Sequence, residues 1–158
     1  MTVLTVRPLA ASDQGAVAAM HERCSMASRR MRYFSAKPGL PRRLFDLFLD
    51  RSRGETLVVR TEAGEIVALA HLMYLRSGSA ELAFLVEDAW QGRGLGRDLA
   101  ERLVDLGRAE GFAELRASVL SENARMRRLL TSLGGRTGRT EDPAVLELVI
   151  GLRELAAV

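Results

Sequence analysis

Cysteine is almost missing from this chain of 158 residues, which contains a single one, Cys24. One thiol cannot form an intrachain disulfide, and it cannot build a cluster of thiolate ligands around a metal. Neither His21 nor His71 comes with a recognisable nucleophile motif, so cysteine catalysis is not expected. The sequence therefore predicts a protein without a disulfide framework and without a bound metal.

Long apolar runs are absent as well, and none approaches the ~20 residues that a membrane-spanning helix needs. Residues 1–10 lack the basic stretch and the long apolar core of a signal peptide. Hydrophobic residues make up 47% of the chain and charged residues 27%, which is ordinary for a globular protein. We expect one cytoplasmic domain, residues 1–158, that has no membrane partner.

Lysine is represented only by Lys37, whereas every other basic residue is an arginine, and the net charge is +3. The arginines are scattered, and aromatic residues at 5% are not interleaved with them, so no nucleic-acid partner is expected. Arg29, Arg30 and Arg32 form one local cluster, which is either surface charge or an attraction for an acidic protein surface. Binding of a small anionic ligand would explain the positive net charge equally well, because the planar guanidinium group of arginine can donate two hydrogen bonds to a phosphate.

Alternating and helical apolar patterns divide the chain into a regular series of elements. Ser12 and Asp13 are predicted to cap the first helix, and Ser121 the last one. Leu95, Leu99, Leu103 and Leu106 are spaced to form one apolar helix face. The predicted strands are 2–7, 56–60, 66–75, 81–86, 112–120 and 144–150; the predicted helices are 13–20, 44–49, 94–110 and 122–133. The short turns after residues 61 and 75 imply antiparallel neighbours, so we predict an α/β domain with a mixed, mostly antiparallel sheet flanked by helices.

The most informative segment is Gln91-Gly92-Arg93-Gly94-Leu95-Gly96, which follows an apolar strand and opens an amphipathic helix. Glycine lets the backbone approach a ligand closely, and the free N–H groups at a helix start attract an anion. The Gly-Lys-Ser/Thr ending of a nucleoside-triphosphate loop is missing. A dinucleotide fingerprint would need glycine at position 97, which is Arg97. The segment therefore predicts a phosphate or pyrophosphate site of another kind.

This segment and its context resemble the GNAT family of N-acetyltransferases over nearly the whole chain. The stretch from Glu81 to Gly96 is most similar to the bacterial Pat-type protein-lysine acetyltransferases. The stretch from Ser25 to Phe34 resembles the Ser…Ser-Arg…Arg-Phe-Phe segment of that subgroup, and Leu120 to Met126 resembles its Leu-x-x-Asn-x-x-Met. The resemblance implies a single GNAT-like domain that binds acetyl-CoA.

The resemblance also implies roles for particular residues. The backbone of Phe84, Leu85 and Val86 would pair with the pantetheine arm, and Asn123 would bond to the same region. Glu81 matches the glutamate that is thought to act as general base. The pyrophosphate would be held by Gln91, Gly92, Arg93, Gly94, Leu95 and Gly96, with help from Arg97.

A base at Glu81 also makes sense from the chemistry of the reaction. An amine with a pKa of ~10.4 gives up its proton at pH 7 at a cost of about 4.6 kcal/mol, and a positioned base contributes ~10²–10⁴-fold. Glu81 begins an otherwise apolar strand, where burial raises the pKa of a carboxyl group. The alternative is a glutamate at a strand end that faces water.

One common family feature is absent from this sequence. The tyrosine that reprotonates the CoA thiolate in many members would fall at position 130, which is Leu130. A thiol with a pKa near ~8.5 is a fair leaving group without much help, and Ser121 or a water could donate the proton.

We therefore predict an acetyl-CoA-dependent N-acetyltransferase that uses no metal and acts on an amine, preferably a protein lysine. A small-molecule amine is the alternative acceptor. A CoA-binding regulatory module without turnover is the alternative outside enzymes, and it would have no need of a base at position 81.

Overall fold

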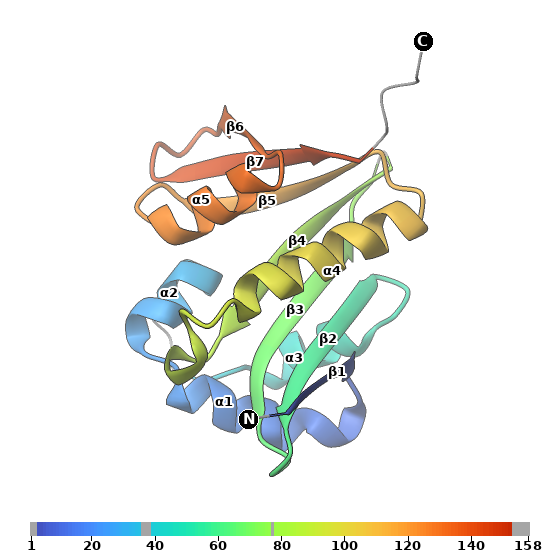
Figure 1. Cartoon of the computed structure of the whole chain (residues 1–158), viewed down its shortest axis with the longest axis vertical. Helices are drawn as coiled ribbons and strands as arrows, with labels where there is room; N and C mark the ends of the chain where they lie inside the picture. Colours follow the sequence, from blue (N-terminus) through green and yellow to red (C-terminus); the bar gives the residue numbers. More distant parts are fainter. Residues whose placement is uncertain (1–2, 36–38, 77, 153–158) are drawn as a thin grey trace.

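The computed structural model describes residues 3–35, 39–76 and 78–152, which form a twisted sheet with helices on both faces (Figure 1). The strands lie in the order β1-β2-β3-β4-β5-β7-β6. Every neighbouring pair is antiparallel except β4 and β5. The strands are β1 (Leu4–Pro8), β2 (Gly54–Thr61), β3 (Ile66–Tyr74), β4 (Ser79–Val86), β5 (Glu114–Leu120), β6 (Arg136–Arg139) and β7 (Val145–Gly151). The predicted α/β class with a mixed, mostly antiparallel sheet is confirmed.

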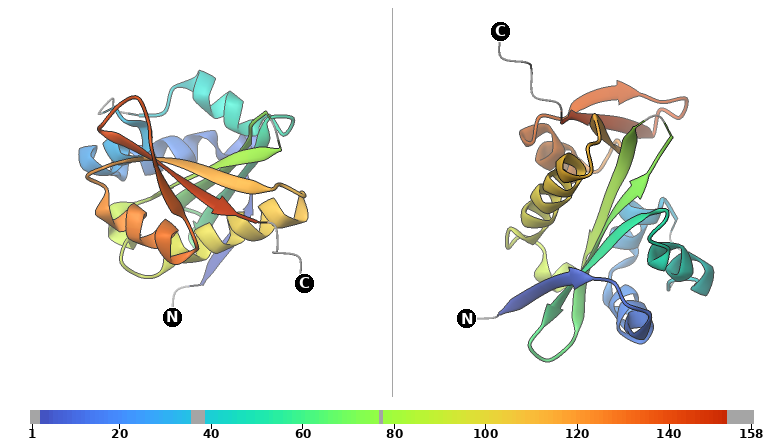
Figure 2. Two further views of the ribbon diagram at one scale, coloured as in Figure 1. Left: turned by 90° about the horizontal axis from the view of Figure 1, so that it is seen from above. Right: turned by 90° about the vertical axis from the view of Figure 1, so that its right-hand side faces the viewer.

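Helices α4 and α5 lie on one face of this sheet, and α1, α2 and α3 lie on the other, as the right-hand view of Figure 2 shows. They are α1 (Gln14–Arg23), α2 (Met26–Tyr33), α3 (Arg42–Leu49), α4 (Leu95–Ala109) and α5 (Ala124–Ser132), with short 3-10 turns η1 (Ala11–Asp13) and η2 (Asp88–Trp90). Phe84 of β4 packs with Leu99 of α4 in one buried cluster. Its neighbour Leu85 packs with Val17 of α1 and Phe45 of α3 in a second cluster on the other face. Alternate residues of β4 thus serve two separate cores.

Helix α4 follows the predicted pattern closely. Leu99 and Leu103 are fully buried, as expected for residues four apart on one helix face. The helix ends at Gly111, which has a φ of +83°, and the N–H of Phe112 donates to the carbonyl of Gly107 at 3.0 Å. This bond closes the helix with a glycine C-cap.

Two elements were not predicted as separate units, and both lack an apolar pattern. Helix α2 has no buried residue, so no stripe of apolar side chains marks it in the sequence. All four residues of β6 are exposed, so the alternation that identifies a half-buried strand is missing.

The predicted helix caps are wrong in their details. Asn123, not Ser121, caps α5, and its Oδ1 accepts a hydrogen bond from the N–H of Met126 at 3.2 Å. Ser121 precedes the first helical residue by three positions, too early for a cap. At the first helix the Asp13 carboxylate accepts from the N–H of Ala10 and from Arg7 instead of capping α1.

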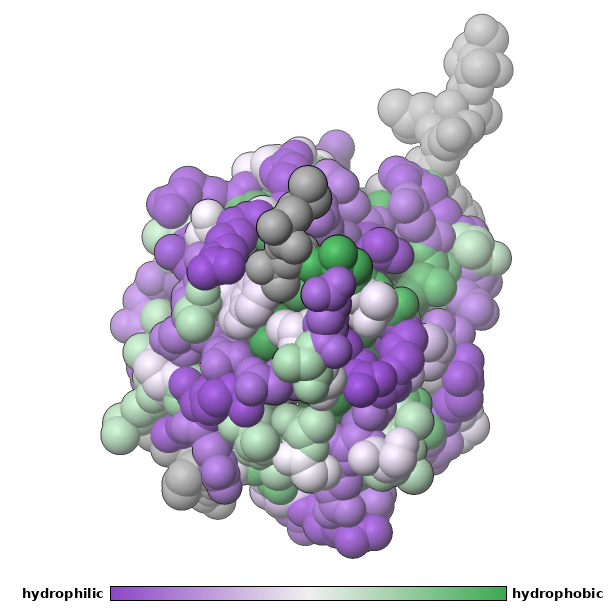
Figure 3. All heavy atoms as spheres, turned by 60° about the horizontal axis from the view of Figure 1, so that its bottom comes forward, coloured by the Kyte–Doolittle hydropathy of each residue, from purple (hydrophilic) through white to green (hydrophobic). Residues whose placement is uncertain are grey.

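The surface is mainly polar in the view of Figure 3, where apolar side chains gather only in small patches. None of the described helices combines the length and the apolar character needed to cross a membrane.

Candidate active site

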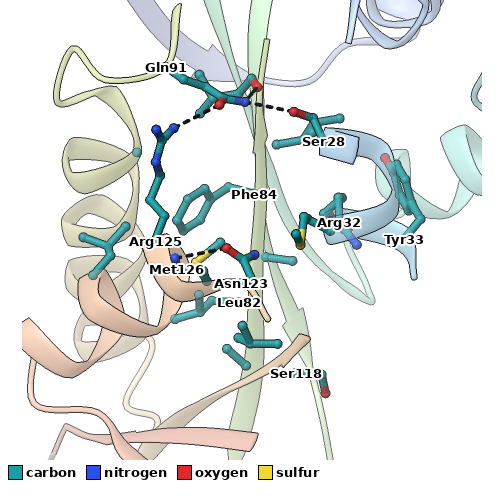
Figure 4. Close-up of a pocket in the computed structure, with 18 of the residues that line it drawn as sticks. Ser28, Arg32, Tyr33, Leu82, Phe84, Gln91, Ser118, Asn123, Arg125 and Met126 are labelled. Atoms are coloured by element: carbon teal, nitrogen blue, oxygen red, sulfur yellow. Dashed lines mark hydrogen bonds between the residues drawn. The ribbon is translucent and has the colours of Figure 1, made fainter. Parts of the chain in front are cut away.

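A cavity of about 560 Å³, the main cavity, opens where strands β4 and β5 separate (Figure 4). The two strands pair at only three positions, from Ser79↔Glu114 to Glu81↔Arg116, and then diverge. The walls come from α2, β4, the segment Gln91 to Gly96 (the glycine turn), the end of β5 and the start of α5. This volume lies in the range of ~300–1,000 Å³ that small-molecule sites occupy.

The wall formed by β4 offers unpaired backbone groups to the main cavity. Where the ladder with β3 begins and ends, the N–H of Leu75 donates to Ser79 and the N–H of Glu87 donates to Val67, each at 2.9 Å. Because paired groups alternate along an antiparallel ladder, the odd-numbered residues of β4 bond to β3. The backbone N–H and C=O groups of residues 82, 84 and 86 therefore point toward β5, which diverges beyond the pair Glu81↔Arg116, so the groups of Phe84 have no neighbouring strand.

The glycine turn places the start of α4 at one end of the cavity. Gly92 and Gly94 have φ values of +75° and +83°, a left-handed conformation that favours glycine. A Cβ at either position would meet no atom within 4 Å, so backbone conformation, not space, requires glycine there. Gly94 begins α4 without a side-chain cap, and the first helical bond is that of the Asp98 N–H. The N–H groups before Asp98 are thus free to bind an anion.

Seven of the eleven predicted cofactor-binding residues line the main cavity: Phe84, Leu85, Val86, Gln91, Gly92, Gly96 and Asn123. The backbone of Leu85 pairs with β3 by the alternation given above, which leaves its side chain to contribute to the wall. Asn123 caps α5 through Oδ1 only, so its Nδ2 is the group that can donate to a ligand.

Gln91 lies across one end of the cavity. Its Nε2 donates to the carbonyl of Val86 at 2.9 Å and to Ser28 Oγ at 3.1 Å, and its Oε1 accepts from Arg125 at 3.0 Å. These bonds join β4, α2 and α5 at this end, as Figure 4 shows. The sequence analysis did not identify Arg125 as a site residue. The only feature that could have indicated it is its position two residues after Asn123.

The other four predicted residues lie outside the lining. The guanidinium of Arg93 stacks on Trp90 at 4.8 Å, and Leu95 is buried in the core. Arg97 donates to Ser132 at 2.9 Å and pairs with Glu101. Gly94 contributes through the start of α4. A direct phosphate contact by the side chain of Arg93 or Arg97 stays a prediction.

Glu81 lies in the wall of the main cavity near the point where β4 and β5 part. Its side chain is partly buried, and this burial raises the pKa of the carboxyl group above its ordinary value of 4.5. Arg32 opposes the rise in the pKa, and the negative charge of Glu147 adds to it. A carboxylate in such surroundings is better suited to accept a proton than one in water.

Arg32 is a second residue that the sequence did not single out for this site. It lines the main cavity, its guanidinium lies 4.6 Å from the centre of the Tyr33 ring, and its buried Nε has no hydrogen-bond partner among the described residues. Tyr33 is held in turn by a 2.7 Å hydrogen bond to His21 Nε2. The sequence offered only a cluster of arginines here, because the position of Arg32 beside the main cavity depends on how α2 docks.

Polar contacts fasten α1 and the start of α2 to the segment that follows β4. Asp88 accepts from the N–H of Ser25 at 2.8 Å and from Ser28 Oγ at 3.1 Å. Arg23 pairs with the buried carboxylate of Glu87 at 2.8 Å. These contacts connect residues 60 or more positions apart, which is why the sequence alone did not reveal them.

Other titratable candidates are unsuited to catalysis. His71 is fully buried, and burial lowers its pKa well below 6.5, so it is neutral. Burial raises the pKa of the Cys24 thiol to about 11, which leaves no reactive thiolate. Leu130, at the position of the missing tyrosine, is fully buried in the core.

Comparison with known proteins identifies the class to which this fold and cavity belong. A family model described as an acetyltransferase (GNAT) domain matches residues 4–136. The GNAT domain of the Streptomyces lividans protein PAT has a crystal structure that superposes with a TM-score of 0.86, at 27% identity over 96% of each chain.

Two curated relatives agree with this assignment. "Acetyltransferase PA5475" of Pseudomonas aeruginosa is 29% identical over 136 residues, which cover 82% of this chain and 73% of that protein. "Acetyltransferase Pat" of Mycolicibacterium smegmatis is 35% identical over 80 residues, or 48% of this chain, but only 24% of that longer protein. The chain belongs to the GNAT acetyltransferase family, and it is an acetyl-CoA-dependent N-acetyltransferase.

Proposed function

We propose that this enzyme acetylates the side-chain amine of a protein lysine, with acetyl-CoA bound in the main cavity and Glu81 as the general base. The main support for the proposal is the cavity between the diverging strands β4 and β5. It extends from the start of α4 to the partly buried carboxylate of Glu81. Similarity to two proteins named Pat supports the choice of a protein acceptor.

The residues of the main cavity fit the parts of acetyl-CoA in order. The start of α4, with Gly92 and Gly94, would hold the pyrophosphate on free N–H groups. The backbone of Phe84 and the N–H of Val86, which point away from β3, would bond to the pantetheine amides as a neighbouring strand does. Asn123 would add a donor through Nδ2. The thioester would then lie toward Glu81, where the strands meet.

Glu81 would prepare the acceptor for attack. The carboxylate takes a proton from the acceptor ammonium, which leaves a neutral amine and a neutral carboxyl group. The amine then attacks the thioester carbonyl, the C–N bond forms, and the C–S bond breaks. Loss of the second amine proton and protonation of the CoA thiolate leave an acetylated amine and CoA. The thiolate proton would come from water, because Leu130 has no proton to give and Ser121 does not line the main cavity.

Incubation with acetyl-CoA and a cell lysate, followed by mass spectrometry of acetylated lysines, tests this proposal. We expect new acetylation on a limited set of proteins with the wild-type enzyme and almost none with Glu81→Gln. A parallel panel of free amino acids, polyamines and amine drugs tests the alternative. Rapid turnover of one of these, with no protein acetylated, would replace the lysine acceptor with a small amine.

A further inference from the structure

A second cavity of about 410 Å³, the small cavity, also has Glu81 and Ser118 in its wall. Both residues line the main cavity as well, so the two spaces meet at these side chains. Figure 4 shows Ser118 at the end of the main cavity away from Gln91. The small cavity therefore reaches the proposed base from the side opposite the glycine turn.

The strand pairing explains why charged side chains gather there. Glu81 of β4 is paired with Arg116 of β5, and Ser118 of β5 is paired with Glu147 of β7. The sequence neighbours of these residues, such as Leu82 and Leu148, are buried in the core against α4. Because side chains alternate along a strand, Glu81, Arg116, Ser118 and Glu147 all project from the other face.

The small cavity has an excess of negative charge. Arg116 is bonded to Glu114 at 2.7 and 3.0 Å and to Glu147 at 2.7 Å, so one guanidinium is shared by two carboxylates. Glu81 adds a third carboxylate when it is ionised, and the remaining cation, Arg76, is exposed. Such a wall attracts a cation and disfavours an anion.

An apolar contact is available beside these charges. Leu75, which is 39% exposed, is one of the few large apolar side chains on the described surface, and it lines the small cavity. A ligand with an aliphatic stem and a charged end could cover Leu75 while its charge reaches the carboxylates.

We propose that the small cavity admits the acceptor, and that Glu147 is a specificity-determining residue that holds the acceptor's ammonium beside Glu81. This inference rests on the proposed function, and it narrows the acceptor to a primary alkyl ammonium that has no carboxylate near the amine. A lysine side chain within a protein and a polyamine share this chemistry. A free α-amino acid does not share it, because its carboxylate would be repelled by the three carboxylates that line the small cavity.

Binding can be measured without turnover, by calorimetry on the enzyme saturated with CoA. The probes are Nα-acetyl-lysine amide, spermidine and glycine. We expect both alkyl amines to bind and glycine not to bind. Glu147→Gln should weaken amine binding about tenfold and leave the affinity for CoA unchanged. Glu141→Gln removes the same charge from an exposed position and should change neither.

One further variant separates the effect of charge in the small cavity from the effect of Glu147 on the position of Arg116. Leu75→Lys places a cation at the exposed wall without touching any salt bridge, and it should also weaken binding of the alkyl amines. If Glu147→Gln acted only by loosening Arg116, Leu75→Lys would leave the binding of the alkyl amines unchanged, which would overturn the proposal.

The outcomes keep the two proposals apart. Amine binding that is equal in wild type, Glu147→Gln and Leu75→Lys would show that the acceptor enters elsewhere, for example along α2. Binding as expected without any acetyl transfer would contradict the proposed function while supporting the small cavity as an amine site. Spermidine turnover without lysine turnover would identify the polyamine as the source of the ammonium.

Discussion

At the scale of single residues, the chemistry depends on how burial changes a carboxyl group. Glu81 has no unusual sequence around it, but in the fold it is partly buried and its pKa is raised. Arg32 limits this rise in the pKa, and a carboxylate with a raised pKa accepts a proton more readily than an exposed glutamate, which suits the proposed base.

We predict that Glu81→Gln lowers kcat by ~10²-fold or more. The amide keeps the size of the side chain but cannot accept a proton, and the affinity for acetyl-CoA should stay close to that of wild type. Steady-state kinetics and calorimetry measure the two quantities. Near-full activity at pH 7 would assign the proton transfer to a water chain.

The pH profile adds a second measurement on the same variant. Below the raised pKa of Glu81 the carboxyl group is protonated, so wild-type kcat/KM should fall as the pH drops through that value. The variant should lack this inflection and should gain activity only at high pH, where the acceptor amine is already neutral.

At the scale of secondary-structure elements, two ends of helices carry distinct roles. The start of α4 has no side-chain cap, and its free N–H groups beside the main cavity are the proposed site of the pyrophosphate. The start of α1 is instead fastened to β1, because Arg7 pairs with Asp13 across the intervening loop at 2.6 Å.

At α4, Gly94→Asp and Gly94→Asn should differ strongly in affinity for acetyl-CoA. Both side chains tolerate a positive φ better than most, so their backbone costs are similar. The aspartate adds a negative charge where the pyrophosphate is expected, and calorimetry should show a weakening of tenfold or more relative to the asparagine variant. Equal affinities in two folded variants would place the phosphates elsewhere.

At α1, Asp13→Asn should destabilise the fold by about 1–3 kcal/mol. Hydrogen bonds from Arg7 lower the pKa of Asp13 below its ordinary value of 3.8. A carboxyl group with a lower pKa in the folded state stabilises that state at pH values above its pKa in the unfolded chain. This stabilisation is lost as the pH falls through the pKa of the folded state. Urea unfolding at pH 7 should therefore separate wild type from the variant, and the gap should shrink toward pH 3.

The exposed pair formed by Asp105 and Arg108 provides a control for this variant. Its atoms are 3.7 Å apart and the Asp105 side chain is 79% exposed. Asp105→Asn should have little effect on unfolding at either pH. An equal loss in both variants would mean that the contact between β1 and α1 is no stronger than a surface pair.

At the scale of the whole molecule, ligand binding should stabilise the fold, because the main cavity is built from elements distant in the sequence. Acetyl-CoA at about 100 times its Kd should add ~2.7 kcal/mol of stability, and the melting temperature should rise by roughly 5–10 °C. NAD and ATP should give no comparable shift, since neither of their glycine motifs is present. A larger shift with either nucleotide would contradict the assignment of the cavity.

Local sequence patterns determined every strand except β6, the apolar face of α4 and the glycine turn. These features are set by periodicity and by backbone conformation, which neighbouring residues fix. The order of elements and the resemblance to GNAT enzymes then predicted the fold class, and both the fold and the family are confirmed.

Tertiary structure alone decided the rest of the site. Helix α2 has no apolar stripe, so only its docking brings Arg32 and Ser28 to the main cavity. The small cavity depends on the register of three strands, which places Glu81, Arg116 and Glu147 together although up to 66 positions separate them in the sequence. Burial and charge at these residues come from long-range packing, and a periodic pattern contains no information about such distances.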